Sequence, residues 1–171
     1  MKHLYAPWRQ KYVTGMSSNG GNKKLTKDEC VFCKQLQDSD DDKYFIIKRF
    51  KHNVLIMNRY PYNAGHLLIL PLKHHADLDE LTAKERAEMM EVLTTAIPIL
   101  GAALGAEGFN VGINLGIAGG GGIPSHLHMH LLPRWRGDTN FLETLGQTKV
   151  ISSDIVRVFE DLKTRFAKVT V

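Results

Sequence analysis

The sequence HLHMHLL at residues 126–132 decides what this chain can fold into and what chemistry it can carry. Alternate residues of a β-strand point to the same face of a sheet. A strand over these residues therefore places His126, His128 and His130 on one face and the apolar residues between them on the other. Three imidazoles at period two predict a functional site, because a core face would be apolar and a solvated face does not require one residue type three times.

A glycine-rich segment, NLGIAGGGGIP at residues 114–124, directly precedes the histidines. Glycine allows close approach of the backbone to a ligand, and the N–H groups of Gly119, Gly120, Gly121 and Gly122 can cradle an anion. A histidine beside a phosphate cradle predicts nucleophilic attack on phosphorus through a phosphohistidine. Two plainer interpretations stay open: a flexible turn for the glycines, and a metal site for the three histidines, since imidazole binds zinc.

The rest of the chain predicts an α+β domain with a mostly antiparallel sheet of five strands. Apolar and β-branched runs between turn signals place the strands at residues 44–50, 53–57, 66–70, 109–114 and 126–132. Thr82 and Glu85 form a capping box that begins a long helix, which bends near Pro98 and ends at Leu104 before Gly105. A last helix is expected over residues 155–167.

Residues 1–28 are expected to form an N-terminal arm and a flexible linker. The linker is polar and glycine-rich, whereas the arm carries Tyr5, Trp8 and Tyr12, which suggests that the arm docks on the body of the protein. The main domain is expected over residues 29–141, followed by a C-terminal helical extension over residues 142–171.

The composition is that of a globular domain. The 171 residues are 43% hydrophobic and 23% charged, which excludes a wholly disordered chain. The net charge of +4 is spread along the chain, so we expect no nucleic-acid partner; it suits an anionic nucleotide and equally aids solubility. No apolar run approaches about 18 residues and no secretory signal is visible, so we expect no membrane span and a cytoplasmic protein.

Cys30 and Cys33 are the two cysteines of the chain, too few for a disulfide framework. Their C-x-x-C spacing fits half of a tetrahedral zinc site, a redox pair or two buried structural thiols. The redox pair has the least support, because no thioredoxin-like strand–helix unit surrounds the two cysteines.

The histidine run resembles the signature of the histidine triad (HIT) family, His-x-His-x-His-x-x with apolar residues at x. The resemblance covers about residues 30–138 and includes the order of strands, helix and glycine loop. The run PRWRGD at residues 133–138 and APWR at residues 6–9 are similar to one bacterial branch, which includes diadenosine tetraphosphate phosphorylases.

The resemblance implies a role for each site residue. His128 would attack the α-phosphate of a nucleotide, His130 would contact the phosphate and assist the leaving group, and His126 would orient the strand. Asn58 matches a ribose-binding position and Asn114 a polar position beside the phosphates. Members of the family are usually homodimers that join two five-stranded sheets.

The resemblance also implies a structural zinc ion. Relatives complete the C-x-x-C pair with a histidine after the third strand and the first histidine of the triad. The ligands here would be Cys30, Cys33, His74 and His126, with His75 as a near-equal candidate for the third position.

The segment before the triad departs from the hydrolase branch of the family. That branch has Gln and Ser or Thr side chains on the phosphate, whereas this chain reads GGIPSH at residues 121–126, so Ser125 or backbone N–H groups must substitute.

The expected activity is nucleotidyl transfer from a dinucleoside polyphosphate to phosphate or water. A purine-nucleoside phosphoramidase, a slow nucleotide-binding regulatory module and a zinc-organised interaction domain are the alternatives. His3, His52 and His66 are expected to be surface or packing residues.

Overall fold

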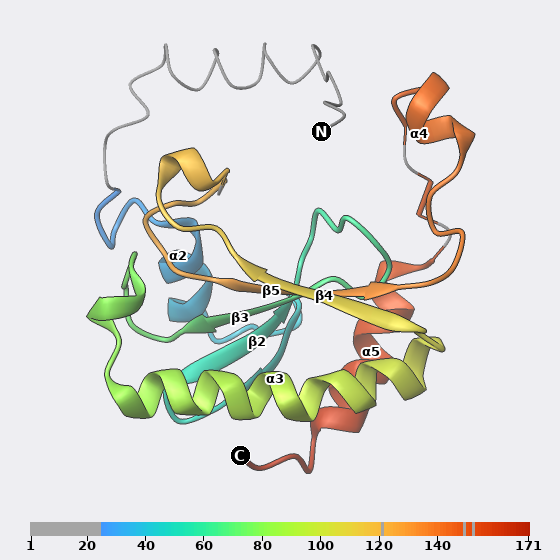
Figure 1. Cartoon of the computed structure of the whole chain (residues 1–171). Helices are drawn as coiled ribbons and strands as arrows, with labels where there is room; N and C mark the ends of the chain where they lie inside the picture. The colour runs from blue at the N-terminus through green and yellow to red at the C-terminus, as the bar shows by residue number, and fades with distance from the viewer. Residues whose placement is uncertain (1–24, 121, 149, 152) are drawn as a thin grey trace.

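The computed structural model describes residues 25–120, 122–148, 150–151 and 153–171 (Figure 1). The predicted N-terminal arm, most of the predicted linker and Gly121 therefore lie outside the described residues.

The centre of the fold is one antiparallel sheet in the order β1-β2-β3-β5-β4. Its strands are β1 (Ile46–Arg49), β2 (Asn53–Met57), β3 (Leu67–Pro71), β4 (Gly108–Ile113) and β5 (Met129–Arg134). The prediction of a five-stranded α+β fold is confirmed, and the ends of β1 to β4 lie within two residues of the predicted bounds.

The predicted strand over residues 126–132 is wrong at its start, because β5 begins only at Met129. The backbone before it has other partners: the N–H of Leu127 donates to the carbonyl of His75 at 2.6 Å, in the loop after β3. The predicted alternation nevertheless holds across this boundary. Leu127, Met129 and Leu131 are all buried in the main core.

Helices cover both faces of the sheet (Figure 1). Among the described residues the helices are α2 (Val31–Gln37), α3 (Ala83–Leu104), α4 (Phe141–Leu145) and α5 (Ile155–Phe166), with 3-10 turns η1 (Leu78–Glu80) and η2 (Ile117–Gly119). The predicted capping box is present, with the Thr82 side chain accepting from the N–H of Glu85, and Gly105 ends α3 in the left-handed conformation at φ 63°. Helices α2 and α4 were not predicted.

The alternation of β2 and β3 divides the interior into two layers. Leu55 and Ile69 face α3 and α5 and belong to a core with Val92, Leu100 and Phe159. Their neighbours face α2, in a second cluster of Cys30, Phe32, Cys33, Ile46, Val54, Ile56, Leu68 and Leu70. The triad histidines lie on this second face, beside α2.

Helix α3 is long and apolar enough to cross a membrane by length and composition alone, a test that core helices of soluble proteins also pass. Its buried side chains, including Met89, Ala96 and Leu100, pack in the core beneath the sheet.

Candidate active site and metal centre

The orientation of His128 leaves one of its ring nitrogens with a free lone pair. Its Nδ1 lies 2.8 Å from the carbonyl oxygen of His126, and because a carbonyl only accepts, Nδ1 carries the proton. The other ring nitrogen, Nε2, is then left with its lone pair. Burial lowers the pKa of His128, so the imidazole is neutral near pH 7.

His130 has the opposite tautomer, fixed by His66. The backbone N–H of Tyr62 donates to Nδ1 of His66 at 3.2 Å, which leaves the proton of His66 on Nε2. That Nε2 donates to Nδ1 of His130 at 2.9 Å, so the proton of His130 is on its own Nε2. This nitrogen is buried and has no hydrogen-bond partner among the described residues. Its N–H is therefore free to donate a hydrogen bond to a ligand.

All three of these imidazoles are neutral near pH 7. Burial, followed by the proximity of His130 and His128, lowers the pKa of His66 to about 3. Burial and then His128 lower the pKa of His130 to about 4. The pair His128 and His130, with ring centroids 4.9 Å apart, thus combines a lone pair with an N–H donor.

The expectation that His66 is a surface or packing residue missed its place in this network. His66 is fully buried, and the amide nitrogen of Asn58 lies 3.3 Å from its Nδ1. A sequence signal did exist: His66, Leu68 and Leu70 have the period of one strand face, and Leu68 pairs with His130 in the sheet register. The contact itself is between residues 64 positions apart.

The glycine loop leads into a second unpartnered donor. Ser125 is buried, and its hydroxyl has no hydrogen-bond partner among the described residues. Gly119 and Gly120 lie on the exposed loop, where Gly120 has φ 85°, and Gly122 is also exposed. The structure therefore brings Ser125 to the buried triad, whereas the described glycines are open to solvent.

Two hollows flank the histidines. One, of about 230 Å³, is lined by residues of α2 and by the strand and loop residues beside them, including the charged side chain of Arg59. The lining residues that matter here are Val31, Phe32, Gln35, Ile56 and Asn58. The Phe32 ring lies 5.3 Å from that of His128, which connects this hollow to the triad.

The second hollow, of about 200 Å³, is lined by Tyr62, His66, His130 and Asn114, together with residues of β4. The Tyr62 ring stacks on His130 at 5.9 Å. A larger hollow of about 530 Å³ lies between the turn at residues 135–140 and the C-terminal extension, but no histidine lines it. His66 and His130 line the second hollow, and Phe32 in the wall of the first contacts His128, so the chemistry points to the two smaller hollows.

A partly buried ion pair fixes the loop that carries Asn58 and Tyr62. Asn63 in this loop donates to Asp138 at 2.8 Å, and Arg134 makes two hydrogen bonds to the same carboxylate at 2.6 and 2.9 Å. The Arg134 side chain holds the pKa of Asp138 well below its usual range. The loop is thereby tied to the end of β5.

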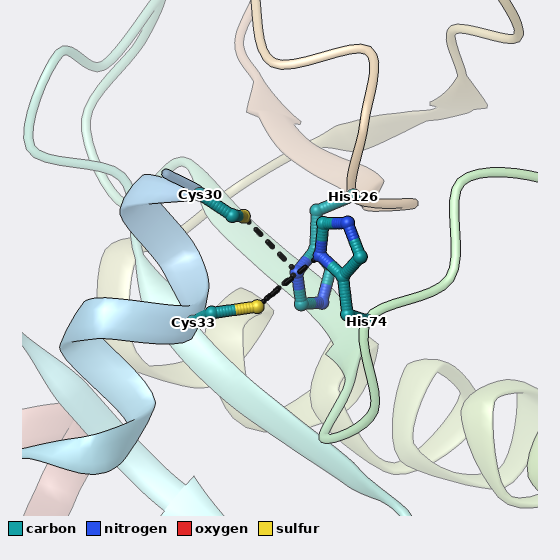
Figure 2. A group of neighbouring side chains, drawn as sticks. All are labelled: Cys30, Cys33, His74 and His126. Carbon is teal, nitrogen blue, oxygen red and sulfur yellow. Dashed lines mark hydrogen bonds between the residues drawn. The ribbon is translucent and has the colours of Figure 1, made fainter. Parts of the chain in front are cut away.

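Cys30, Cys33, His74 and His126 form a cluster whose ligand atoms lie within 4.8 Å of one another (Figure 2). Nδ1 of His126 is 3.5 Å from both sulfur atoms, and Nδ1 of His74 is 3.2 Å from Sγ of Cys33. Tetrahedral zinc has bonds of about 2.3 Å to sulfur and about 2.0 Å to nitrogen, so a sulfur and a nitrogen bound to the same zinc ion lie about 3.5 Å apart. The donor set and spacing therefore fit zinc.

The outer contacts of the two histidines also suit a metal. Nε2 of His126 lies 2.9 Å from the carbonyl of Pro71, and Nε2 of His74 lies 3.2 Å from the carbonyl of Leu25. Each Nε2 must carry the proton, which leaves the Nδ1 lone pairs for an ion. His75 lies outside the cluster, with its Nδ1 3.9 Å from Glu80.

Comparison with known families matches the HIT domain to residues 40–137. The chain belongs to the histidine triad family. AP-4-A phosphorylase of Mycobacterium tuberculosis is 35% identical over 151 residues, which cover 88% of this chain and 77% of the relative. Bis(5'-nucleosyl)-tetraphosphatase [asymmetrical] of Schizosaccharomyces pombe is 27% identical over 93 residues, 54% of this chain and 50% of the relative.

A solved structure gives the same histidine triad fold. A Zn-bound histidine triad family protein from Mycobacterium smegmatis matches with a TM-score of 0.67 and 26% identity, covering 84% of this chain and 96% of the other. The predictions of the family, of its α+β fold and of an enzyme of this family are confirmed.

Proposed function

We propose that the protein cleaves a dinucleoside polyphosphate, such as diadenosine tetraphosphate, by nucleotidyl transfer through His128. The observation that carries this proposal is the pairing of the two tautomers. A lone pair on Nε2 of His128 and a buried, unpartnered N–H on Nε2 of His130 are what an in-line attack on a phosphate needs.

In the first step, Nε2 of His128 attacks the α-phosphorus. A P–N bond forms, and the P–O bond to the polyphosphate leaving group breaks. His130 donates a hydrogen bond from its Nε2–H to the phosphate and to the departing oxygen, and the polyphosphate leaves as an anion that carries the electron pair of the broken bond. In the second step inorganic phosphate or water attacks the same phosphorus, the P–N bond breaks, and His128 recovers its lone pair. The proton of the acceptor is released to solvent.

The hollow beside α2 would hold the transferred nucleoside. Its apolar walls, Phe32 and Ile56, suit a base, and the side chain of Asn58 suits ribose hydroxyls. Ser125 and the N–H groups of the loop containing Gly119, Gly120, Gly121 and Gly122 would bind phosphate oxygens. Asn114 and Tyr62 line the hollow on the leaving-group side.

The acceptor is proposed to be inorganic phosphate more readily than water. The similarity to AP-4-A phosphorylase supports this, and so does the absence of the hydrolase branch's Gln and Ser or Thr before the triad. A captured phosphate would compete with water because it acts at high effective concentration. The tetraphosphatase similarity supports water as the second candidate.

Product analysis tests both the reaction and the acceptor. Diadenosine tetraphosphate with millimolar phosphate should give ADP and ATP, whereas water as acceptor gives AMP and ATP. Equal rates of AMP formation with and without phosphate, and no ADP, would refute the phosphate acceptor. Adenosine 5′-phosphoramidate in the same panel tests the phosphoramidase, and nucleotide binding without labelled enzyme would indicate a regulatory module.

Zinc held by Cys30, Cys33, His74 and His126 would be structural, because four protein ligands close the tetrahedral site. When bound, it would supply folding energy by tying α2 to the segment before β5.

We further propose a homodimer formed through β4, which is an edge strand with Asn110, Val111 and Gly112 exposed. A second sheet added there would join two five-stranded sheets. The division into an arm at residues 1–28, a domain at residues 29–141 and an extension at residues 142–171, and a cytoplasmic location, remain proposals.

A further inference from the structure

We propose that metal binding and nucleotide binding are thermodynamically coupled, so that the metal centre controls nucleotide affinity. The coupling runs through α2 and His126. This inference rests on the proposed function, because it takes the hollow beside α2 as the nucleoside site.

One helical turn serves both sites. Cys30 immediately precedes α2 and Cys33 lies in its first turn, and both belong to the metal cluster. Val31 and Phe32, which lie between them, line the nucleoside hollow, as does Gln35. Successive residues of a helix are about 100° apart around its axis, so this turn presents one side to the metal and another to the nucleoside. A shift that releases the cysteines must also move the wall of the hollow.

His126 makes the same connection from the other side. Its Nδ1 faces the two cysteines, as Figure 2 shows, while its carbonyl oxygen accepts the hydrogen bond that fixes the tautomer of His128. The ring of Phe32 contacts both imidazoles, with centroids 5.6 Å from His126 and 5.3 Å from His128. Metal ligand, nucleophile and pocket wall are therefore in direct contact.

Helix α2 has little else to fix its first turn. It spans seven residues, and Cys30 provides no side-chain cap. A helix of this length is not stable by itself and depends on its tertiary contacts. The Arg49 side chain donates to the carbonyls of Leu36 and Asp38, but these lie at the far end of the helix. At the end that lines the hollow, the backbone N–H of Cys30 donates to the carbonyls of Thr26 and Lys27, which lie in the preceding turn. Within the part of the chain that the structure describes, the polar side-chain contacts that tie this end to the sheet are those of the metal cluster, alongside the burial of Phe32.

Coupling between two sites is reciprocal and commonly changes affinity by about 5- to 150-fold. We expect the dissociation constant of AMP, measured by isothermal titration calorimetry, to rise by about tenfold or more when zinc is removed. The zinc dissociation constant, measured by chelator competition, should fall by the same factor when AMP is saturating.

A matched pair of variants locates the effect. His74→Ala removes a metal ligand that does not line the nucleoside hollow, so it should weaken both zinc and AMP binding. His75→Ala removes the adjacent imidazole, which lies outside the cluster, and should leave both affinities unchanged. Circular dichroism in the far ultraviolet shows whether each protein is folded.

A third measurement does not require metal-free protein. Co²⁺ bound to the full-length chain gives thiolate and ligand-field absorption that reports the geometry of its ligands. AMP should shift these bands, because it contacts the wall formed by the same helical turn.

The outcomes separate the two proposals. Absence of AMP binding to zinc-loaded protein would refute the proposed function and this inference with it. If AMP binds folded zinc-free or His74→Ala protein as tightly as the zinc-loaded chain, the coupling is refuted and the proposed function stands. If zinc removal unfolds the chain, unchanged Co²⁺ bands on AMP binding refute the coupling, and shifted bands support it.

Discussion

Replacing His66 with glutamine should change how the stability of the protein depends on pH. His66 is fully buried, and its pKa is lowered from 6.5 to about 3, mainly by that burial. The unfolded chain takes up a proton on this imidazole below about pH 6.5, whereas the folded protein does not. The unfolded state therefore binds more protons between these values, so the stability of the wild type must fall as the pH is lowered through them.

The two pKa values set the size of this effect. At pH 5 nearly all unfolded molecules and few folded molecules carry the proton on His66. The linkage relation then gives a loss of about 2 kcal/mol of unfolding free energy between pH 7 and pH 5. His66→Gln cannot lose this contribution, because glutamine does not titrate and its amide can still donate to His130.

The comparison isolates His66 from its neighbours. The pKa of His130 is lowered by its own burial and by His128. Its contribution to the pH dependence of the unfolding free energy is therefore the same in the wild type and in His66→Gln, and it cancels in the difference between them. Urea titrations at pH 7, 6 and 5, at one zinc concentration, give both free energies by linear extrapolation. A difference between the two proteins that stays constant with pH to within about 0.5 kcal/mol would show that His66 is not buried and neutral.

Three further substitutions test the site. His128→Ala should abolish turnover while the dissociation constant of AMP, measured calorimetrically, changes by less than about tenfold; surviving activity would disprove the nucleophile. Metal analysis should find about one zinc ion per chain in the wild type, and Cys33→Ser should lower both this zinc content and the melting temperature. Wild-type protein that contains no zinc when purified without chelator would contradict this prediction. Ser125→Ala should lower kcat/KM about 10-fold or more with little change in melting temperature, because its hydroxyl has no hydrogen-bond partner in the described part of the chain; unchanged kinetics would remove it from the phosphate site.

The sequence predicted the elements whose causes are local. The capping box of Thr82 and Glu85 and the left-handed Gly105 set the ends of α3 through contacts within four residues. The apolar alternation of Leu127, Met129 and Leu131 identified the buried face of the histidine segment.

What sequence reasoning missed depends on contacts between distant segments. The start of β5 is set by the hydrogen bond from Leu127 to His75, which no local pattern announces. Helix α2 has neither a side-chain cap nor enough length to be predicted, and it exists because Cys30, Phe32 and Cys33 are buried against the sheet. The sequence could not decide whether His74 or His75 is the third ligand of the metal site, because the two residues are adjacent and have the same side chain. The fold decides it by placing His74, and not His75, beside the two cysteines.

The C-terminal helix lies outside the region that matches the family but inside the part of the chain that folds as one core. The family match ends at residue 137, but Phe159, Leu162 and Phe166 of α5 are buried in the same core as the central strands. Lys48 of the edge strand β1 donates to the carbonyls of Phe166 and Ala167 at 2.9 and 2.8 Å. These hydrogen bonds hold the last turn of α5 against β1. A gene fragment cut at the homology boundary would encode every histidine of the triad and still lack part of the interior that holds them in place.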